Sequence, residues 1–231
     1  MLLNRLSSAF AYLVLFYLLV LTACTGHSWS ISALRCEYLR SPIHIDVSSP
    51  RFTWGYEGSA GGMQTAYQLE LADAKEALLQ EKPLWTSGRV ESGQSKAVYS
   101  GAEQLRPHAR YYWRVTAWDN RGQRVVSAID SFETAKMQET DWTAQWITDQ
   151  HDASFGPAPM FRKVFSIHKE IAAARLYVSA AAYYKLYLNG KEAGTAQLDP
   201  GYTHYDKRNL YTTLDVTSAL RMGENVVATV L

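Results

Sequence analysis

The sequence predicts an all-β protein built from two successive sandwiches. Short stretches in which apolar or aromatic residues alternate with polar ones recur along the chain, as in residues 51–56 and 67–71, and this alternation is typical of half-buried strands. The composition agrees, because 15 Tyr and 7 Trp suit pleated, half-buried surfaces. A chain of 231 residues is long enough for two modest domains.

The first sandwich is predicted over residues 38–136. Its one stretch rich in helix-forming residues, 72–81, is short and indicates a turn of helix between strands. Leu105, Pro107 and Tyr111 have the spacing of a tyrosine corner, in which the hydroxyl bonds to backbone a few residues upstream. About seven strands in such a length are typical of an immunoglobulin-like or fibronectin type III-like sandwich.

A change of composition over residues 137–157 predicts an interdomain linker, and we expect its Trp142 and Trp146 to pack onto neighbouring domains. Residues 158–231 then predict a jelly-roll sandwich of the galactose-binding-like kind. Asn189-Gly190 lies between two β-prone runs, which is the strongest short hairpin signal. We count about six strands where a jelly roll has about eight, so we expect this domain to be C-terminally truncated.

The N-terminus has the layout of an export signal. Arg5 is followed by an uncharged run over residues 6–23, whose most apolar part has the length of a signal-peptide core. Leu21-Thr22-Ala23-Cys24 resembles the bacterial lipobox, which implies a signal peptide over residues 1–23 and lipid attachment to Cys24. Residues 24–37 would follow as a linker. The alternatives are an ordinary secretory peptide or an uncleaved anchor with a chance cysteine.

These features predict an exported, membrane-anchored lipoprotein of the periplasm or of the outer membrane or cell surface. Stable anchoring takes two or more acyl chains, and a lipoprotein cysteine carries two or three. The 23 basic and 22 acidic residues are balanced and form no basic block, which argues against a nucleic-acid partner. With Cys24 lipidated, Cys36 stands alone, and the six scattered His form no metal-type spacing. We therefore expect no metal site and no cofactor.

Carboxylate pairs and exposed aromatic residues are the remaining candidates for chemistry. Asp199 and Asp206 are the best pair for glycoside hydrolysis, which needs two carboxylates at a set separation. Their turn and charged-edge contexts favour a structural role, so we assign no catalytic residue. Tyr202, Tyr205 and Asp206 form an aromatic and polar cluster that suits carbohydrate binding. The alternative is that these aromatic residues dock onto another domain or fill a core.

Many short motifs, in order from about residue 38 to the end, carry a family resemblance. They include Arg51-Phe52-Thr53-Trp54, Tyr111-Tyr112-Trp113-Arg114-Val115, Phe132-Glu133-Thr134, Asp141-Trp142, Leu188-Asn189-Gly190-Lys191 and Pro200-Gly201-Tyr202-Thr203. In these the chain resembles the N-terminal region of bacterial α-L-rhamnosidases, a glycoside hydrolase family. One departure is Val125-Val126-Ser127-Ala128, where the family often has a Trp-Ser pattern.

The resemblance implies a fibronectin-like module, a jelly-roll module and then a catalytic α/α barrel beyond residue 231. We therefore expect the non-catalytic N-terminal portion of a lipid-anchored rhamnosidase-type enzyme, with rhamnosides as ligands and the barrel as an intramolecular partner. Whether the chain by itself is an enzyme stays open. One alternative is a stand-alone surface carbohydrate-binding lipoprotein. Another is a different sandwich-bearing hydrolase, such as a β-galactosidase relative, but the fibronectin-like module in first place argues against it.

Overall fold

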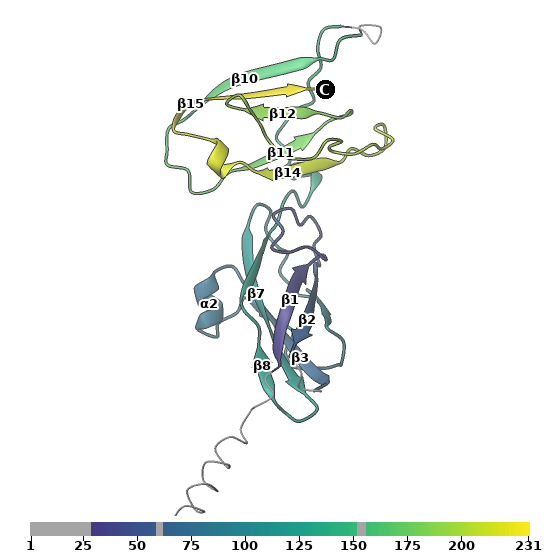
Figure 1. Ribbon diagram of the computed structural model, residues 1–231, viewed down its shortest axis with the longest axis vertical. Coiled ribbons are helices and arrows are strands. Elements are labelled where there is room, and N and C mark those ends of the chain that lie inside the picture. The colour runs from purple at the N-terminus through teal and green to yellow at the C-terminus, as the bar shows by residue number, and fades with distance from the viewer. Residues whose placement is uncertain (1–28, 59–61, 152–155) are drawn as a thin grey trace, which may run out of the picture.

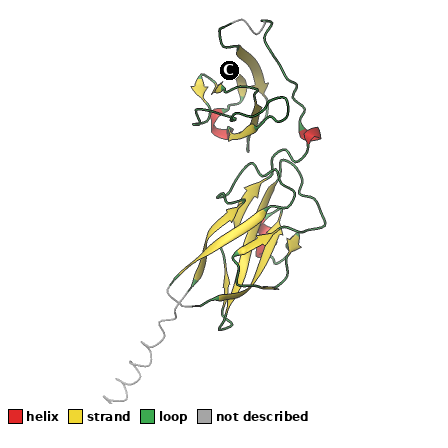
Figure 2. Cartoon of the chain, turned by 90° about the vertical axis from the view of Figure 1, so that its right-hand side faces the viewer, coloured by secondary structure: helices red, strands yellow, loops and turns green. Residues whose placement is uncertain are grey.

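The computed structural model describes residues 29–58, 62–151 and 156–231, and within them strands predominate, as Figures 1 and 2 show. The chain forms two stacked β domains joined by an extended segment. This confirms the predicted all-β class and the order of the two sandwiches. The predicted signal peptide and Cys24 lie outside the described residues.

The first domain packs a three-stranded sheet against a larger antiparallel one. The first sheet has the order β1-β2-β6, and the second has β4-β3-β7-β8 with β5 beside β3 and β9 beside β7. The strands of the first sheet are β1 (Ser30–Cys36), β2 (Arg51–Glu57) and β6 (Lys96–Val98). Those of the second are β3 (Gln64–Ala72), β4 (Trp85–Thr86), β5 (Val90–Glu91), β7 (Arg110–Asp119), β8 (Arg124–Val126) and β9 (Asp130–Glu133).

Two local features differ from or refine the sequence expectations. Strand β1 lies inside the segment 24–37 expected as a linker, and it pairs with β2 because Ile31 and Cys36 fill the core. The expected turn of helix within residues 72–81 is α2 (Lys75–Leu79), and its Leu78 is fully buried.

Strand β7 organises the core of this domain. Its alternate residues Tyr111, Trp113, Val115 and Ala117 are buried, as the period of two along a strand requires. The ring of Phe52 in the opposite sheet lies 4.7 Å from that of Trp113. The tyrosine corner is present, because the backbone N–H of Arg106 donates to the Tyr111 hydroxyl at 2.9 Å.

The second domain also has two sheets. One has the order β10-β15-β12-β13 and the other contains β11 and β14. Their bounds are β10 (Met160–Ile167), β11 (Arg175–Ser179), β12 (Lys185–Leu188), β13 (Lys191–Glu192), β14 (Tyr211–Asp215) and β15 (Gly223–Val230). Asn189 and Gly190 join β12 to β13 with φ of 51° and 82°, so the predicted hairpin is confirmed.

The core of the second domain is much thinner than that of the first. Only Ala180, Tyr184 and Leu186 form its buried cluster, and the side chains around them are partly exposed. Strand β11 has no fully buried residue. A two-stranded sheet cannot cover a four-stranded one, so apolar residues of the inner face remain accessible.

The segment between the domains contains the short 3-10 turn Glu139–Asp141. Trp142 packs onto the second domain, where its ring lies 5.2 Å from that of Tyr211. Trp146 is 65% exposed, so within the described residues the expectation that both tryptophans pack holds for Trp142 only.

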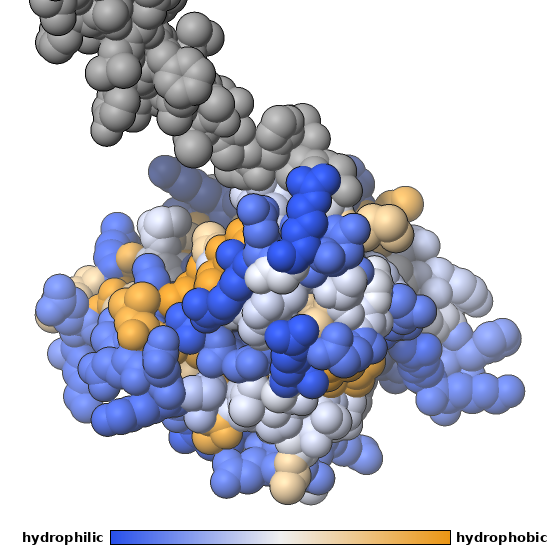
Figure 3. Space-filling model, turned by 90° about the horizontal axis from the view of Figure 1, so that it is seen from below, coloured by the Kyte–Doolittle hydropathy of each residue, from blue (hydrophilic) through white to orange (hydrophobic). Residues whose placement is uncertain are grey.

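Seen from the end of the first domain where β1 begins, the surface is mainly hydrophilic, and its hydrophobic residues gather mostly on one side (Figure 3). No helix in the described ranges is long and apolar enough to cross a membrane.

The tyrosine corner gives a stability prediction. Tyr111→Phe leaves the buried ring in place but removes the acceptor of the Arg106 N–H, so we expect the free energy of unfolding to fall by about 1–2 kcal/mol. Chemical denaturation followed by tryptophan fluorescence measures it. Tyr38→Phe is the control, because Tyr38 is 54% exposed. An equal loss in both variants would contradict the role of the corner.

Candidate functional site: the interdomain junction

The two domains meet around one carboxylate. Glu133, at the end of β9, accepts hydrogen bonds from Arg175 of β11 at 2.7 and 2.9 Å. Arg110, in the first domain, donates from Nε to the same carboxylate at 2.8 Å. The Glu133 and Arg175 side chains are 14% and 13% exposed. Glu133 is therefore held from both sides, and the bidentate contact to Arg175 fixes direction as well as distance.

Charges around Glu133 stabilise its ionised form. Partial burial by itself raises the pKa of Glu133, but the hydrogen bonds and charges of Arg175 and Arg110 outweigh it and lower the pKa below its usual value. Arg175 also pairs with Asp215 of β14 at 2.9 Å. The junction thus contains an alternating chain of cations and anions that crosses from one domain to the other.

Aromatic contacts lie beside this ion-pair chain. His108 Nδ1 is 3.0 Å from the hydroxyl of Tyr177 in β11, and the two rings are edge to face. Burial and the positive charge of Lys136 lower the pKa of His108, so the ring is neutral at pH 7. The Lys136 ammonium lies 5.1 Å from the Tyr177 ring centre and 5.2 Å from that of Trp142.

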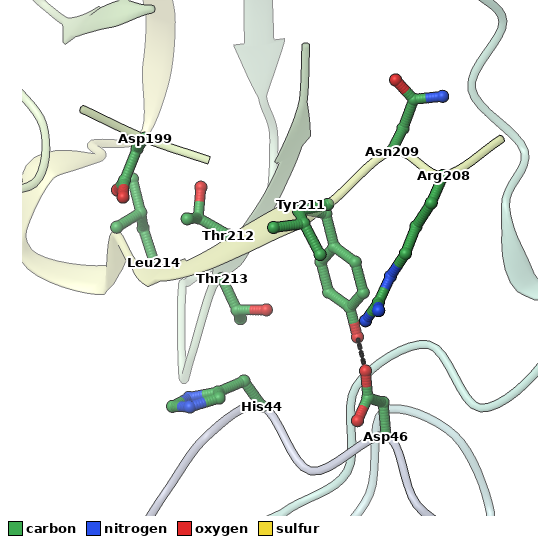
Figure 4. A pocket seen from close by; sticks show the side chains of 10 residues that line it. His44, Asp46, Asp199, Arg208, Asn209, Tyr211, Thr212, Thr213 and Leu214 are labelled. Atoms are coloured by element: carbon green, nitrogen blue, oxygen red, sulfur yellow. Dashed lines mark hydrogen bonds between the residues drawn. The ribbon is translucent and has the colours of Figure 1, made fainter. Parts of the chain in front are cut away.

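A groove of about 530 Å³ opens next to the junction. Its walls come from the loop of the first domain before β2 and from β14 with the segment preceding it. The lining residues are His44, Asp46, Asp199, Arg208, Asn209, Leu210, Tyr211, Thr212, Thr213 and Leu214. Figure 4 shows Tyr211 and Arg208 extending toward His44 and Asp46, with Asp199 on the other side of β14.

Tyr211 connects the groove to the first domain. Its hydroxyl donates to Asp46 at 3.4 Å. Burial, together with the nearby charge of Asp46, raises the pKa of Tyr211 to about 12, so the phenol stays protonated as a donor. Arg208 has no hydrogen bond or ion pair from its guanidinium group within the described residues. Free donors beside carboxylates suit binding of a polar partner.

The structure places the predicted carbohydrate-binding residues outside this groove. Tyr202 and Tyr205 lie together, with ring centres 5.5 Å apart, and Tyr202 is 72% exposed. Asp206 is exposed in the same loop. Of the two weighed carboxylates, only Asp199 lines the groove. No group of three or more metal-ligating side chains occurs in the parts of the chain that the structure describes.

Sequence reasoning missed the junction residues. His44 and His108 belong to the six scattered His without metal-type spacing, and neither Asp46 nor Arg175 lies in a local motif. The available signal was the family resemblance, whose matching stretches include Phe132-Glu133-Thr134 and, further along the chain, segments that contain Arg208 and Tyr211. Tyr211 follows the aromatic loop directly, but its contact with Asp46 joins residues that are far apart in the sequence.

Comparisons with known proteins agree with this two-domain arrangement. Residues 31–138 match the family described as Rha78A-like, N-terminal immunoglobulin domain. Residues 169–231 match the family described as α-L-rhamnosidase N-terminal domain. An α-L-rhamnosidase of Formosa agariphila is 30% identical over 83% of this chain, and one of Alteromonas sp. strain LOR is 31% identical over 83%. The chain spans only 23% and 22% of their lengths.

Solved structures also match most of this chain over only about a quarter of their own length. The α-L-rhamnosidase from Dictyoglumus thermophilum superposes with a TM-score of 0.82 at 35% identity, over 87% of this chain and 25% of that one. The enzyme from Aspergillus terreus gives a TM-score of 0.71 at 27% identity, over 88% and 24%. The chain is therefore an N-terminal region of the α-L-rhamnosidase type, with the immunoglobulin domain and the rhamnosidase N-terminal domain in that order.

Proposed function

We propose that this chain is the exported, lipid-anchored and non-catalytic N-terminal portion of an α-L-rhamnosidase-type glycoside hydrolase. The observation that carries the proposal is the ordered match to two N-terminal domains, together covering about a quarter of relatives named α-L-rhamnosidase. The catalytic domain of the protein would follow residue 231, and its substrates would be rhamnose-containing glycans or glycosides.

The junction supports a positioning role for this portion. Glu133, Arg175 and Arg110 join the domains through several charge-assisted hydrogen bonds, and aromatic contacts flank them. Such a junction holds the second domain in a fixed direction relative to the first. A domain attached after β15 would inherit that direction, so the chain would present the catalytic domain away from the membrane.

The pair of Tyr202, which is exposed, and Tyr205, which is partly buried, favours a second candidate, a surface carbohydrate-binding role without hydrolysis. The ring of Tyr202 is largely uncovered, and aromatic faces stack on sugar rings. Asp206 in the same loop would accept hydrogen bonds from sugar hydroxyls. This candidate shares the lipid anchor with the first one and differs from it in needing no catalytic domain.

Lipid attachment is tested by labelling. Expressed in a bacterial host with radiolabelled palmitate, the full chain should incorporate label and sediment with membranes, because two or three acyl chains anchor stably. Cys24→Ala should abolish both. Cys36→Ala is the matched control, since these are the only two cysteines, and it should keep the label. Membrane association of Cys24→Ala without label would favour an uncleaved anchor instead.

The non-catalytic role is tested with the chain alone. We expect no release of nitrophenol from 4-nitrophenyl α-L-rhamnopyranoside above the rate of the buffer. Turnover that scales with protein concentration would overturn the role. Saturable binding of L-rhamnose that is lost in Tyr202→Ala, again without turnover, would favour the carbohydrate-binding candidate.

The junction is tested through Glu133. Glu133→Gln removes the charge between Arg110 and Arg175, and we expect it to lower the stability of the junction by about 1–3 kcal/mol. Small-angle scattering should show a wider distribution of interdomain distances. Glu37→Gln is the matched control, because Glu37 is 15% exposed and pairs with Arg51 inside the first domain.

The pH dependence has a definite sign. The pKa of Glu133 is lowered in the folded chain. Its contribution to the stability of the junction is therefore fully present above the unfolded-state pKa of about 4.3. It is lost as the pH falls through the folded-state pKa. Acid should therefore broaden the distribution of interdomain distances in the wild type and leave that of the Glu133→Gln variant unchanged. Equal broadening of both would contradict the assignment.

A further inference from the structure

The folded part of the chain begins close to Cys24. Trp29 directly precedes β1, is 8% exposed, and has its ring 4.8 Å from that of Tyr56. The linker expected over residues 24–37 is therefore shortened to the four residues 25–28. Whatever path these residues take, the five Cα–Cα steps from Cys24 to Trp29 span at most about 18 Å. The end of the first domain at which β1 begins thus lies within that distance of the Cys24 backbone.

Several strand ends meet at this end of the domain, which points away from the second domain (Figure 1). Ser30 at the start of β1 is paired with Glu57 at the end of β2. The N–H of Asn120, in the turn after β7, donates to the carbonyl of Met63 just before β3, at 3.0 Å. We call the surface formed by Ser30, Glu57, Met63 and the turn of residues 119–124 the lower end.

The turn at the lower end directs its positive charges outward. Arg121 and Arg124 are exposed, and within the described residues neither guanidinium has an ion pair or a hydrogen bond. The carboxylate of Asp119 in the same turn is 3% exposed and accepts hydrogen bonds from the N–H groups of Arg121 and Gln123, at 2.9 and 2.7 Å. Glu57 is the one exposed acidic residue of the lower end, so cations predominate among its outward charges.

An apolar side chain lies beside these arginines. Met63 is 72% exposed and adjoins the turn through the hydrogen bond from Asn120. A guanidinium group binds phosphate oxygens in pairs, and a flexible thioether side chain adapts to irregular apolar surroundings. Two arginines next to a methionine therefore suit the boundary between phospholipid headgroups and acyl chains.

We propose that the lower end is a membrane-contact surface, which rests on anionic phospholipid headgroups through Arg121, Arg124 and Met63 and holds the first domain upright. The inference rests on the proposed function, because it requires the lipid on Cys24. So short a tether keeps the lower end at a high effective concentration beside the headgroups. The lipid supplies the affinity, and contacts too weak to bind by themselves determine the orientation.

A domain that lies on its side fits an anionic membrane less well. The side that carries α2 would then face the headgroups. Its exposed charged residues are three acidic ones and two basic ones, namely Asp73, Glu76, Glu81, Lys75 and Lys82. An excess of acidic groups is repelled by anionic lipids, whereas Arg121 and Arg124 are attracted to them. The upright orientation also lifts the second domain away from the headgroups by the length of β7.

Fluorescence quenching on the lipidated chain tests the orientation. The chain is reconstituted in vesicles of phosphatidylethanolamine and phosphatidylglycerol that contain a lipid with a nitroxide on its headgroup. A fluorophore is attached to Gln123→Cys at the lower end, to Glu76→Cys in α2 or to Lys191→Cys in β13, while Cys36 is fully buried and stays unlabelled. Quenching at position 123 should exceed that at the other two positions about threefold or more, and it should fall when phosphatidylglycerol is omitted.

Two kinds of variant locate the contact. Replacing Arg121 and Arg124 together by Ala should reduce quenching at position 123 about twofold. Replacing Lys75 and Lys82 by Ala is the matched control, because it removes the same charge from the side of α2, and quenching should stay unchanged. A twelve-residue Gly-Ser spacer after Ser28 raises the r.m.s. span of the tether from about 12 to about 23 Å. It should lower the quenching, and it leaves the residues of both domains unaltered.

Several results would overturn the proposal. These are equal quenching at the three labelled positions, strongest quenching in α2, equal effects of the two double variants, or quenching unaffected by the spacer or by phosphatidylglycerol. Palmitate labelling of Cys24, measured on the same preparations, separates the two levels of the argument. With the lipid present, any of these results contradicts the membrane contact alone. Absence of the lipid contradicts the proposed anchoring and the membrane contact with it.

Discussion

The carboxylate of Glu133 is the interaction on which the arrangement of the two domains depends. Among the described residues it is the one acidic group in contact with arginines from both domains, at the end of β9 where the first sandwich faces the second. The Arg175 guanidinium cannot move away without leaving a partly buried carboxylate with half its partners, and loss of one partner costs more than the intact pair contributes. The His108–Tyr177 and Tyr211–Asp46 contacts join the same two domains beside it.

The two domains differ in what stabilises them. The first has a continuous aromatic core in which Phe52, Trp113 and Phe132 pack ring against ring. The second relies more on polar contacts, such as the amide of Asn189 donating to Asn225 at 2.9 Å. A domain with few buried apolar side chains gains more from its neighbours than one with a full core. The junction is therefore a place where the second domain gains stability.

The local features of the fold could be predicted from the sequence, because each is determined by residues close together in the chain. The Asn189-Gly190 turn, the alternation along β7 and the tyrosine corner all depend on neighbours within a few positions. The junction could not be predicted in this way. Arg175 and Glu133 are separated by 42 residues, and Tyr211 and Asp46 by 165, so their pairing follows from how the sandwiches stack.

The loop that contains Tyr202 and Tyr205 also shows how far residue type alone can predict a site. Its composition indicated a binding surface, and Tyr202 and Tyr205 do lie together. However, the groove is formed by the neighbouring residues Arg208 and Tyr211 with a loop of the first domain. Trp146 looked like a packing residue and is largely exposed. Residue type shows which side chains are suited to contact, whereas the partner domain decides which of them make it.

The length of β7 determines how far apart the two ends of the first domain lie. This strand of ten residues runs from the junction, at Arg110, to the far end of the first domain, where β1 begins (Figure 1). At about 3.3 Å per residue it separates those two ends by roughly 33 Å. The second domain therefore begins about one bilayer thickness away from the end of the first domain at which β1 starts. The first sandwich thereby acts as a rigid spacer, and the length of β7 determines the length of that spacer.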